Sequence, residues 1–300
     1  MRLARAVALA AALASAAQGA RAEERIRVRL EGSGKIEDLR LEDYVAGVVA
    51  GEMPSSFPPE ALEAQAVAAR SYALTRKLEA QRTGKPWDIG AGVLAQVYQG
   101  RHSPAARAAA DATLGEVLVL GMEPVEAYFH SVCCGQTESG LAALGRDLPY
   151  LAPVDCGGCD DVPGAHWRRE LSAAELGRVA GLGGPADAVR VASRTQTGRA
   201  ERIEITRGDR SAMLAAADLR QRLGFARLPS LAFEVAPSTA LRPSTSSGAQ
   251  GERGFAFEGS GLGHGAGMSQ HGAAAMARTG KTYREILAHY YPGTEVVKMY

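Results

Sequence analysis

The spacing of apolar residues changes from a strand period to a helix period within the first part of the chain. Residues 26–30 alternate apolar and charged side chains, and two is the period of a half-buried strand. Residues 41–52 carry apolar side chains at helical spacing, so that one stripe of this segment faces a core. Pro54 disfavours helical angles in the residue before it, so the helix is predicted to end at residue 52.

A second helix is predicted after Ser55-Ser56, with Pro58 and Pro59 at its first positions and Gly84 at its end. Its many alanines allow close packing against a neighbour. The patterns farther along predict strands at 117–120, 125–130, 188–192, 202–206, 231–235 and 255–257, and short helices near 172–180, 211–223, 270–279 and 282–290. Helices and strands that do not alternate regularly are typical of an α+β fold. We therefore expect an N-terminal helical pair packed on a mostly antiparallel sheet, in a single globular catalytic unit.

The first 22 residues have the pattern of a secretory signal peptide. Arg2 and Arg5 precede an apolar run over 6–17, and Ala20-Arg21-Ala22 places small residues at the two positions that a signal peptidase reads. We expect cleavage here and export of residues 23–300 to the periplasm or the cell exterior. No later segment is long and apolar enough to span a membrane.

Composition narrows the classes of function. The 300 residues include 34 basic and 33 acidic side chains, a balance too even for a protein that binds nucleic acid through a basic surface. An apolar content of 46% is too high for a disordered chain. Residues 236–253 are dense in Pro, Ser, Thr and Gly and lack apolar periodicity, so they are interpreted as a flexible surface insertion.

Glu52 is the first candidate catalytic residue. It continues the apolar stripe of the first helix, four residues after Val48, and lies at the helix C-terminus. Burial and the negative end of the helix dipole both raise the pKa of a carboxyl group, and a general acid that works near neutral pH needs such a raised pKa. The alternative is a structural Glu that turns outward or pairs with a basic residue such as Arg70.

Residues 259–270 form a glycine-rich segment with two functional side chains. Its five glycines permit close backbone approach to a ligand, while His264 and Ser269 supply hydrogen-bonding groups. The segment does not fit a phosphate-binding loop, because no Lys-Ser or Lys-Thr pair follows. The alternative is a glycine-rich turn that contains a structural histidine.

The four cysteines form a third candidate site. Cys133 and Cys134 follow His130, and Cys156 and Cys159 form a C-x-x-C pair. One histidine with three or four thiolates suits a tetrahedral structural Zn²⁺ site, whereas two disulfides are the alternative in an oxidising compartment. A thiol oxidoreductase is disfavoured, because no strand-to-helix unit surrounds the C-x-x-C pair.

Taken together, three segments resemble the stage II sporulation protein D family, also called the SpoIID/LytB family of peptidoglycan-acting proteins. They are LEDYVAGVVAGEMPSSFPPEALEAQAVAARSYAL (41–74), AYFHSVCCGQTES (127–139) and GLGHGAGMSQHGAAAMARTGKTYREILAHYYPGTE (261–295). They occur in the family's order, and three motifs of this length make the resemblance specific.

The resemblance implies a lytic transglycosylase that cuts peptidoglycan glycan strands from which the peptides have been removed. Glu52, in the family's E-M-P motif, would be the catalytic acid, and the product would carry a 1,6-anhydro sugar end. The alternative, from another branch of the family, is a glycan-binding module that enhances a cell-wall amidase without cutting. Either function places the protein at the cell wall.

The resemblance also suggests which other residues face the sugar. His264, Ser269 and His271 lie in the matching C-terminal segment, although the family usually has Tyr where this chain has His271. Glu258 stands where many members carry a hydroxyl residue. Loss of the signal peptide leaves a net charge of −2, which gives no general attraction to anionic polymers, so we expect local groups that include Arg70 to bind the glycan.

Some family members hold Zn²⁺ with His and Cys residues of the middle segment. The resemblance therefore implies a zinc site here made of His130, Cys133 and Cys159, with Cys156 as the fourth ligand.

Overall fold

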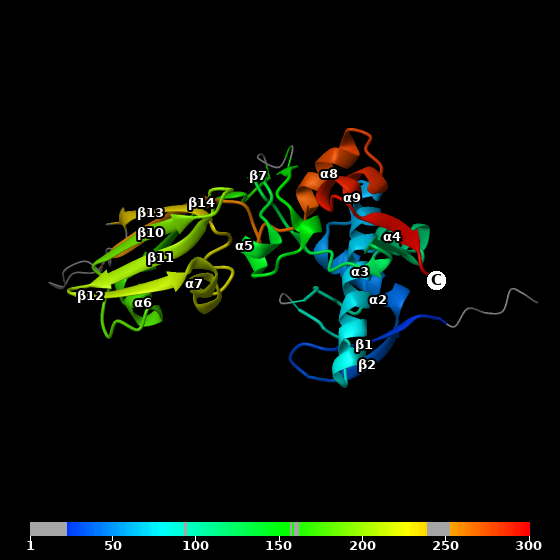
Figure 1. Cartoon of the computed structure of the whole chain (residues 1–300), viewed down its shortest axis with the longest axis horizontal. Helices are drawn as coiled ribbons and strands as arrows, with labels where there is room; N and C mark the ends of the chain where they lie inside the picture. Colours follow the sequence, from blue (N-terminus) through cyan, green and yellow to red (C-terminus); the bar gives the residue numbers. More distant parts are fainter. Residues whose placement is uncertain (1–22, 93–94, 157, 159–161, 239–252) are drawn as a thin grey trace, which may run out of the picture.

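The computed structural model describes residues 23–92, 95–156, 158, 162–238 and 253–300. It shows a main lobe and a second lobe beside it, each with its own hydrophobic core (Figure 1). The second core is built from residues 167–257, so this lobe is an insertion between two parts of the main lobe. The α+β class with mostly antiparallel strands is confirmed. The predicted signal peptide, residues 1–22, lies outside the described residues.

The main lobe is organised around one long helix, α3 (Pro59–Thr83), which packs against helices on several sides (Figure 1). Many of the residues that α3 buries are alanines, and their small side chains let neighbouring backbones approach closely. The other elements of this lobe are β1 (Arg25–Arg29), β2 (Ile36–Arg40), α2 (Leu41–Glu52), β3 (Ile89–Gly90), α4 (Pro104–Ala112), β4 (Glu116–Leu120), β5 (Glu123–Pro124), β6 (Phe129–His130), β7 (Gly135–Gln136), α5 (Gly140–Leu144), a 3₁₀ turn (Pro149–Leu151), β8 (Asp155–Cys156), β15 (Met268–Ser269), α8 (Gln270–Arg278), α9 (Tyr283–Tyr290) and β16 (Glu295–Lys298).

The ends of α2 and α3 match the sequence prediction. Met53 takes extended angles ahead of Pro54, so α2 ends at Glu52. Gly84 ends α3 in the left-handed conformation, with a φ of 69°, which glycine adopts without the steric cost of a Cβ atom. The end of α2 makes Glu52 the last residue of that helix, where its side chain is partly exposed.

The strand predicted over 125–130 is wrong over 125–128, and only residues 129–130 form a strand, β6. The N–H of Ala127 donates to the Val125 carbonyl and the N–H of Tyr128 donates to the Glu126 carbonyl, so the chain turns on itself between β5 and β6. The short β6 then pairs in parallel with β15. This pairing brings the middle of the chain beside the C-terminal segment that leads into α8.

The inserted lobe consists of two three-stranded antiparallel sheets in the orders β10-β11-β12 and β13-β14-β9, with two short helices. Its elements are β9 (His166–Ser172), α6 (Ala173–Val179), β10 (Ala188–Arg194), β11 (Ala200–Arg207), β12 (Arg210–Ala215), α7 (Ala216–Leu223), β13 (Ala232–Ser238) and β14 (Gly254–Ser260). The helix predicted near 211–223 is therefore wrong over its first part, because residues 210–215 pair with β11 as a strand. Of the predicted insertion 236–253, residues 239–252 lie outside the described residues.

The two lobes meet through β9 and β14, which pair with His166 opposite Ser260. Buried Arg199 adds a second connection, because its guanidinium donates to the carbonyl oxygens of Cys133 and Gln136 in the main lobe. Among the helices of the described ranges, none has both the length and the apolar character needed to cross a bilayer.

Candidate functional site

Glu52 is held at the end of α2 by the backbone of a nearby loop. Its Oε1 accepts a hydrogen bond of 2.7 Å from the N–H of Val97. The preceding residue, Gly51, makes this approach possible, because a Cβ atom there would lie 2.4 Å from the Val97 carbonyl oxygen. The absence of a side chain at residue 51 thus allows the loop to reach the carboxylate.

Buried Gln96 fixes this loop against both helices of the N-terminal pair. Its side-chain oxygen accepts a 2.9 Å hydrogen bond from the Tyr44 hydroxyl on α2, and its side-chain nitrogen donates to the Ala69 carbonyl on α3 at 3.2 Å. The N–H of the next residue is thereby held in place as a donor to Glu52.

Gln270, the first residue of α8, supplies the second donor. Its Nε2 lies 3.2 Å from Oε2 of Glu52 and 3.4 Å from Oε1 of Gln65 on α3. The Nε2 of Gln65 is buried and has no hydrogen-bond partner among the described residues. Sequence reasoning missed both glutamines. Two features of the sequence could have identified them: Gln65 is a polar residue on the alanine-rich face of α3, and Gln270 directly follows the candidate residue Ser269.

The pKa of Glu52 is raised above its usual value, in the direction that the sequence suggested. Burial is the largest cause, and the hydrogen bonds from Val97 and Gln270 oppose it by stabilising the charged form. Glu52 is nevertheless partly exposed. The arrangement is a carboxyl group that holds its proton more strongly than usual and also has two donors ready for its ionised form.

A Gln270→Met variant is expected to raise the pKa of Glu52 further, because methionine keeps the approximate side-chain volume but removes a donor to the carboxylate. Titration of the Glu52 side-chain carbon by NMR measures this, with Glu52→Gln to assign the signal. Gln221→Met, an exposed position on α7, serves as the control and should leave the titration unchanged. An unchanged or lower pKa in Gln270→Met would contradict this account.

The predicted residues of the C-terminal segment lie on both sides of Gln270. Ser269 is fully buried and caps α8 by accepting a 3.2 Å hydrogen bond from the Gly272 N–H. His271 is partly exposed, its ring lies edge-on to Phe57 at 5.0 Å, and burial lowers its pKa. Near neutral pH an uncharged His271 can therefore both donate and accept hydrogen bonds beside the Glu52 site.

His264 lies farther along the same side of α3. Its ring contacts Tyr128 with centroids 6.1 Å apart, and Tyr128 in turn contacts Tyr72 at 5.2 Å. Tyr72 follows Gln65 by seven positions on α3, so the two residues share one face of the helix. Burial, with a smaller contribution from Arg220, lowers the pKa of His264 to about 4, so this imidazole is neutral at physiological pH.

The structure does not bring Arg70 and Glu258 to this site. Arg70 is fully buried and makes a bidentate ion pair with Glu42, with N–O distances of 2.9 and 2.6 Å. Its ion pair is therefore with Glu42 and not with Glu52. Glu258 lies on β14 of the inserted lobe, where its exposed side chain pairs with Arg168.

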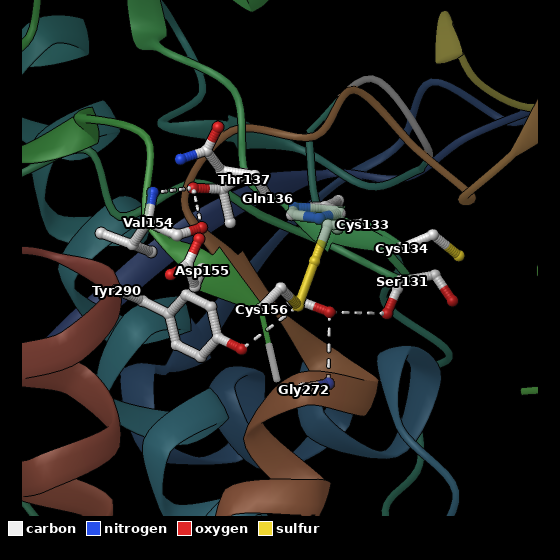
Figure 2. The surroundings of a disulfide bond; sticks show 12 residues. Ser131, Cys133, Cys134, Gln136, Thr137, Val154, Asp155, Cys156, Gly272 and Tyr290 are labelled. Carbon is white, nitrogen blue, oxygen red and sulfur yellow. Dashed lines mark hydrogen bonds between the residues drawn. A yellow bond between two sulfur atoms is a disulfide. The ribbon is translucent and has the colours of Figure 1, made fainter. Parts of the chain in front are cut away.

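A disulfide joins Cys133 to Cys156 and ties the segment after β6 to β8. Figure 2 shows this bond with Tyr290 and Gly272, from the two C-terminal helices, beside Cys156. The Tyr290 hydroxyl lies 3.5 Å from the Cys156 sulfur, and a Cβ atom on Gly272 would lie 2.7 Å from it. The disulfide therefore packs directly behind α8, whose first residue contacts Glu52.

The predicted zinc ligands fit a metal only in part. Nδ1 of His130 donates to the Ala266 carbonyl at 3.1 Å, which leaves Nε2 unprotonated, and this buried nitrogen has no hydrogen-bond partner in the described part of the chain. That suits a metal ligand. The sulfurs of Cys133 and Cys156 do not, because bonded sulfurs are not thiolates.

Cys159 lies outside the described residues, and within those ranges no group of three or more His, Cys, Asp or Glu side chains is placed to hold a metal ion. The four-residue zinc set thus does not fit the disulfide form. Zinc binding stays a prediction for the form with free thiols.

Comparison with known proteins adds two family matches. Residues 30–120 match the family described as Stage II sporulation protein, and residues 166–267 match a domain of unknown function. The second match coincides with the inserted lobe. The region of the Glu52 site contributed by α2, α3 and the Val97 loop lies within the first.

Curated relatives extend over most of the chain. An uncharacterized protein of Brachyspira hyodysenteriae is 33% identical over 268 residues, covering 87% of this chain and 68% of that protein. Stage II sporulation protein D of Bacillus subtilis is 31% identical over 278 residues, covering 87% of this chain and 75% of that protein. An amidase enhancer of Bacillus subtilis is 28% identical, and the match covers 83% of this chain but 39% of that protein. With the fold, the family match and relatives of this extent, the chain belongs to the stage II sporulation protein D family.

Proposed function

We propose that this protein is a lytic transglycosylase that cleaves peptide-stripped glycan strands of peptidoglycan, with Glu52 as general acid and then general base. Family membership and the amidase-enhancer relative support a role at the cell wall. The observation that carries the finer proposal is the Glu52 carboxyl, which is largely buried but still partly exposed. Burial raises its pKa, and two fixed donors face its oxygens.

The proposed reaction uses one carboxyl group twice. Protonated Glu52 gives its proton to the glycosidic oxygen as the bond from that oxygen to the anomeric carbon of N-acetylmuramic acid breaks. The C6 hydroxyl oxygen of the same sugar then bonds to the anomeric carbon, and its proton returns to Glu52. The products are a 1,6-anhydro end and a free hydroxyl on the departing sugar. No water is consumed, so a second carboxylate to activate water is not required.

Two features of the site shift the pKa of Glu52 in opposite directions, and each suits one of the two proton transfers. Burial favours the protonated acid that must be present at the start. The Val97 N–H and the Gln270 amide stabilise the carboxylate that exists between the two proton transfers.

The second candidate function is a glycan-binding module that enhances a cell-wall amidase, which the name of one relative favours. Under either function we propose that the protein is exported and acts at the cell wall, in the periplasm or outside the cell. The Cys133–Cys156 disulfide supports such a compartment, because disulfides persist in oxidising surroundings.

The product distinguishes the two functions. Purified protein is incubated with peptide-stripped glycan strands, and the new ends are analysed by mass spectrometry. A lytic transglycosylase is expected to give ends lighter by one water molecule than the ends that hydrolysis would give. Strand binding without new ends, together with a faster partner amidase, would instead establish the enhancer.

A further inference from the structure

Two adjoining hollows lie on the main lobe beside the β1–β2 turn. The first, of about 500 Å³, is bordered by residues 29–34, Trp87 and residues 90–91. The second, of about 290 Å³, is bordered by Glu37 and by residues 97–100. Both are lined by Leu30, Glu31 and Ala91, so the two hollows are direct neighbours and are treated together as one groove. We call it the Trp87 groove.

The Trp87 groove adjoins the loop that holds the candidate acid. Val97 lines its second hollow, and the N–H of Val97 is the group that donates to Glu52. Tyr98, in the same wall, is fixed against α2 because its ring lies 5.2 Å from that of Tyr44. A chain-like ligand that extends from Glu52 past the Val97 loop would therefore reach the groove beside the β1–β2 turn.

The far end of the groove combines an aromatic ring with charged side chains. Trp87 is partly exposed, and the guanidinium of Arg29 lies 4.6 Å from the centroid of its ring. Within the described part of the chain neither Arg29 nor Glu31 makes an ion pair. Arg29 covers one face of the indole, and the part of Trp87 that stays exposed offers apolar surface to a ligand, while Arg29 and Glu31 offer a donor and an acceptor beside it.

These groups match the chemistry of amino sugars. A sugar ring presents an apolar face of C–H groups that can pack on an indole, and its hydroxyl and acetamido groups need donors and acceptors at the edge. Peptide-stripped glycan also carries a carboxylate on alternate sugars, which an Arg without an ion-pair partner can bind.

We infer that the Trp87 groove is a distal binding site for amino-sugar units of the strand that Glu52 acts on, with Trp87 as the stacking surface. This inference rests on the proposed function, in that the Glu52 site must accept a glycan. It makes Trp87 a determinant of binding for long strands and leaves short fragments bound at Glu52 unaffected.

The test measures binding without turnover. In a Glu52→Gln background, peptide-stripped strands and a disaccharide fragment are titrated by calorimetry into proteins that carry Trp87→Ala, Trp87→Tyr or no further change. Trp87→Ala is expected to weaken binding of long strands about tenfold and to leave disaccharide binding unchanged. Trp87→Tyr, which keeps a flat ring, should restore most of the affinity.

Phe225→Ala is the control, because Phe225 is an exposed aromatic residue that also lies beneath an arginine, with Arg220 at 4.5 Å from its ring centroid, but it lies on the inserted lobe. It should bind long strands as the background protein does. The inference would be overturned if Trp87→Ala bound long strands as tightly as the Glu52→Gln background protein does. It would also be overturned if Trp87→Ala weakened binding of long strands and of the disaccharide by the same factor. This binding test does not depend on catalysis. If the parent protein forms no anhydro ends but Trp87→Ala still weakens binding of long strands, the proposed binding site is supported and the proposed enzymatic activity is rejected. If the Glu52→Gln protein without a further change binds no glycan strand, the inference is overturned.

Discussion

A Glu52→Gln variant is expected to form anhydro ends about 10²- to 10⁴-fold more slowly than the parent protein. Glutamine keeps the shape of the side chain but cannot donate the proton that the leaving oxygen needs or take up the proton of the C6 hydroxyl. The measurement is the rate of appearance of anhydro ends from peptide-stripped strands, with equal amounts of folded protein. An undiminished rate in the variant would remove Glu52 from the reaction.

Stability provides the control for this variant. Because burial raises the pKa of Glu52, the folded protein keeps this proton to higher pH than the unfolded chain does. The free energy of unfolding therefore falls as the pH rises between the two pKa values, and above that window the charged carboxylate destabilises the fold. Uncharged glutamine removes this effect, so the variant should be at least as stable as the parent at neutral pH. A less stable variant would mean that lost activity reflects lost structure.

The largest expected effect on stability comes from the ion pair inside the main lobe. An Arg70→Met variant leaves the Glu42 carboxylate buried without its partner, and breaking a buried pair in this way costs about 3–5 kcal/mol. Arg70 also donates to the carbonyl oxygens of Ala110 and Glu116, which join α4 and β4 to α3. Urea unfolding of parent and variant measures the loss.

Two further variants make this second result specific. Changing Glu42 to Leu together with Arg70→Met removes the stranded charge and should recover part of the stability. Glu258→Gln, in the exposed pair with Arg168, should unfold as the parent does. If Arg70→Met were as stable as the parent but bound glycan strands weakly, Arg70 would instead be a substrate-binding residue, as the sequence suggested.

Local signals in the sequence were enough to predict the helices around Glu52. Pro54 and Gly84 act on the backbone where they stand, so they mark the ends of α2 and α3 without knowledge of the rest of the fold. The alternation over 125–130 failed in its first four residues, because backbone hydrogen bonds between near neighbours turn the chain there. Residues 211–215 were assigned to a helix because their pairing partner, β11, cannot be identified from their own pattern.

The candidate site was predictable only in its central residue. Glu52 could be found from its place on an apolar stripe and from family resemblance. Its partners come from far along the chain, with Val97 and Gln270 separated from it by 45 and 218 residues. Arg70 was expected to bind the glycan and Cys133 to bind zinc, but the structure pairs Arg70 with Glu42 and Cys133 with Cys156. These partners are distant in the sequence and come together only when the chain folds.

The paired strands β9 and β14 have a consequence for how this chain can change in evolution. Because the inserted lobe departs from the main lobe at His166 and returns opposite it at Ser260, its two ends are neighbours in space. A lobe attached in this way can be lengthened, shortened or exchanged while the strands at its base keep their spacing, and the residues around Glu52 keep their own core. The separate family matches to 30–120 and 166–267 are consistent with two units that have been combined in one chain.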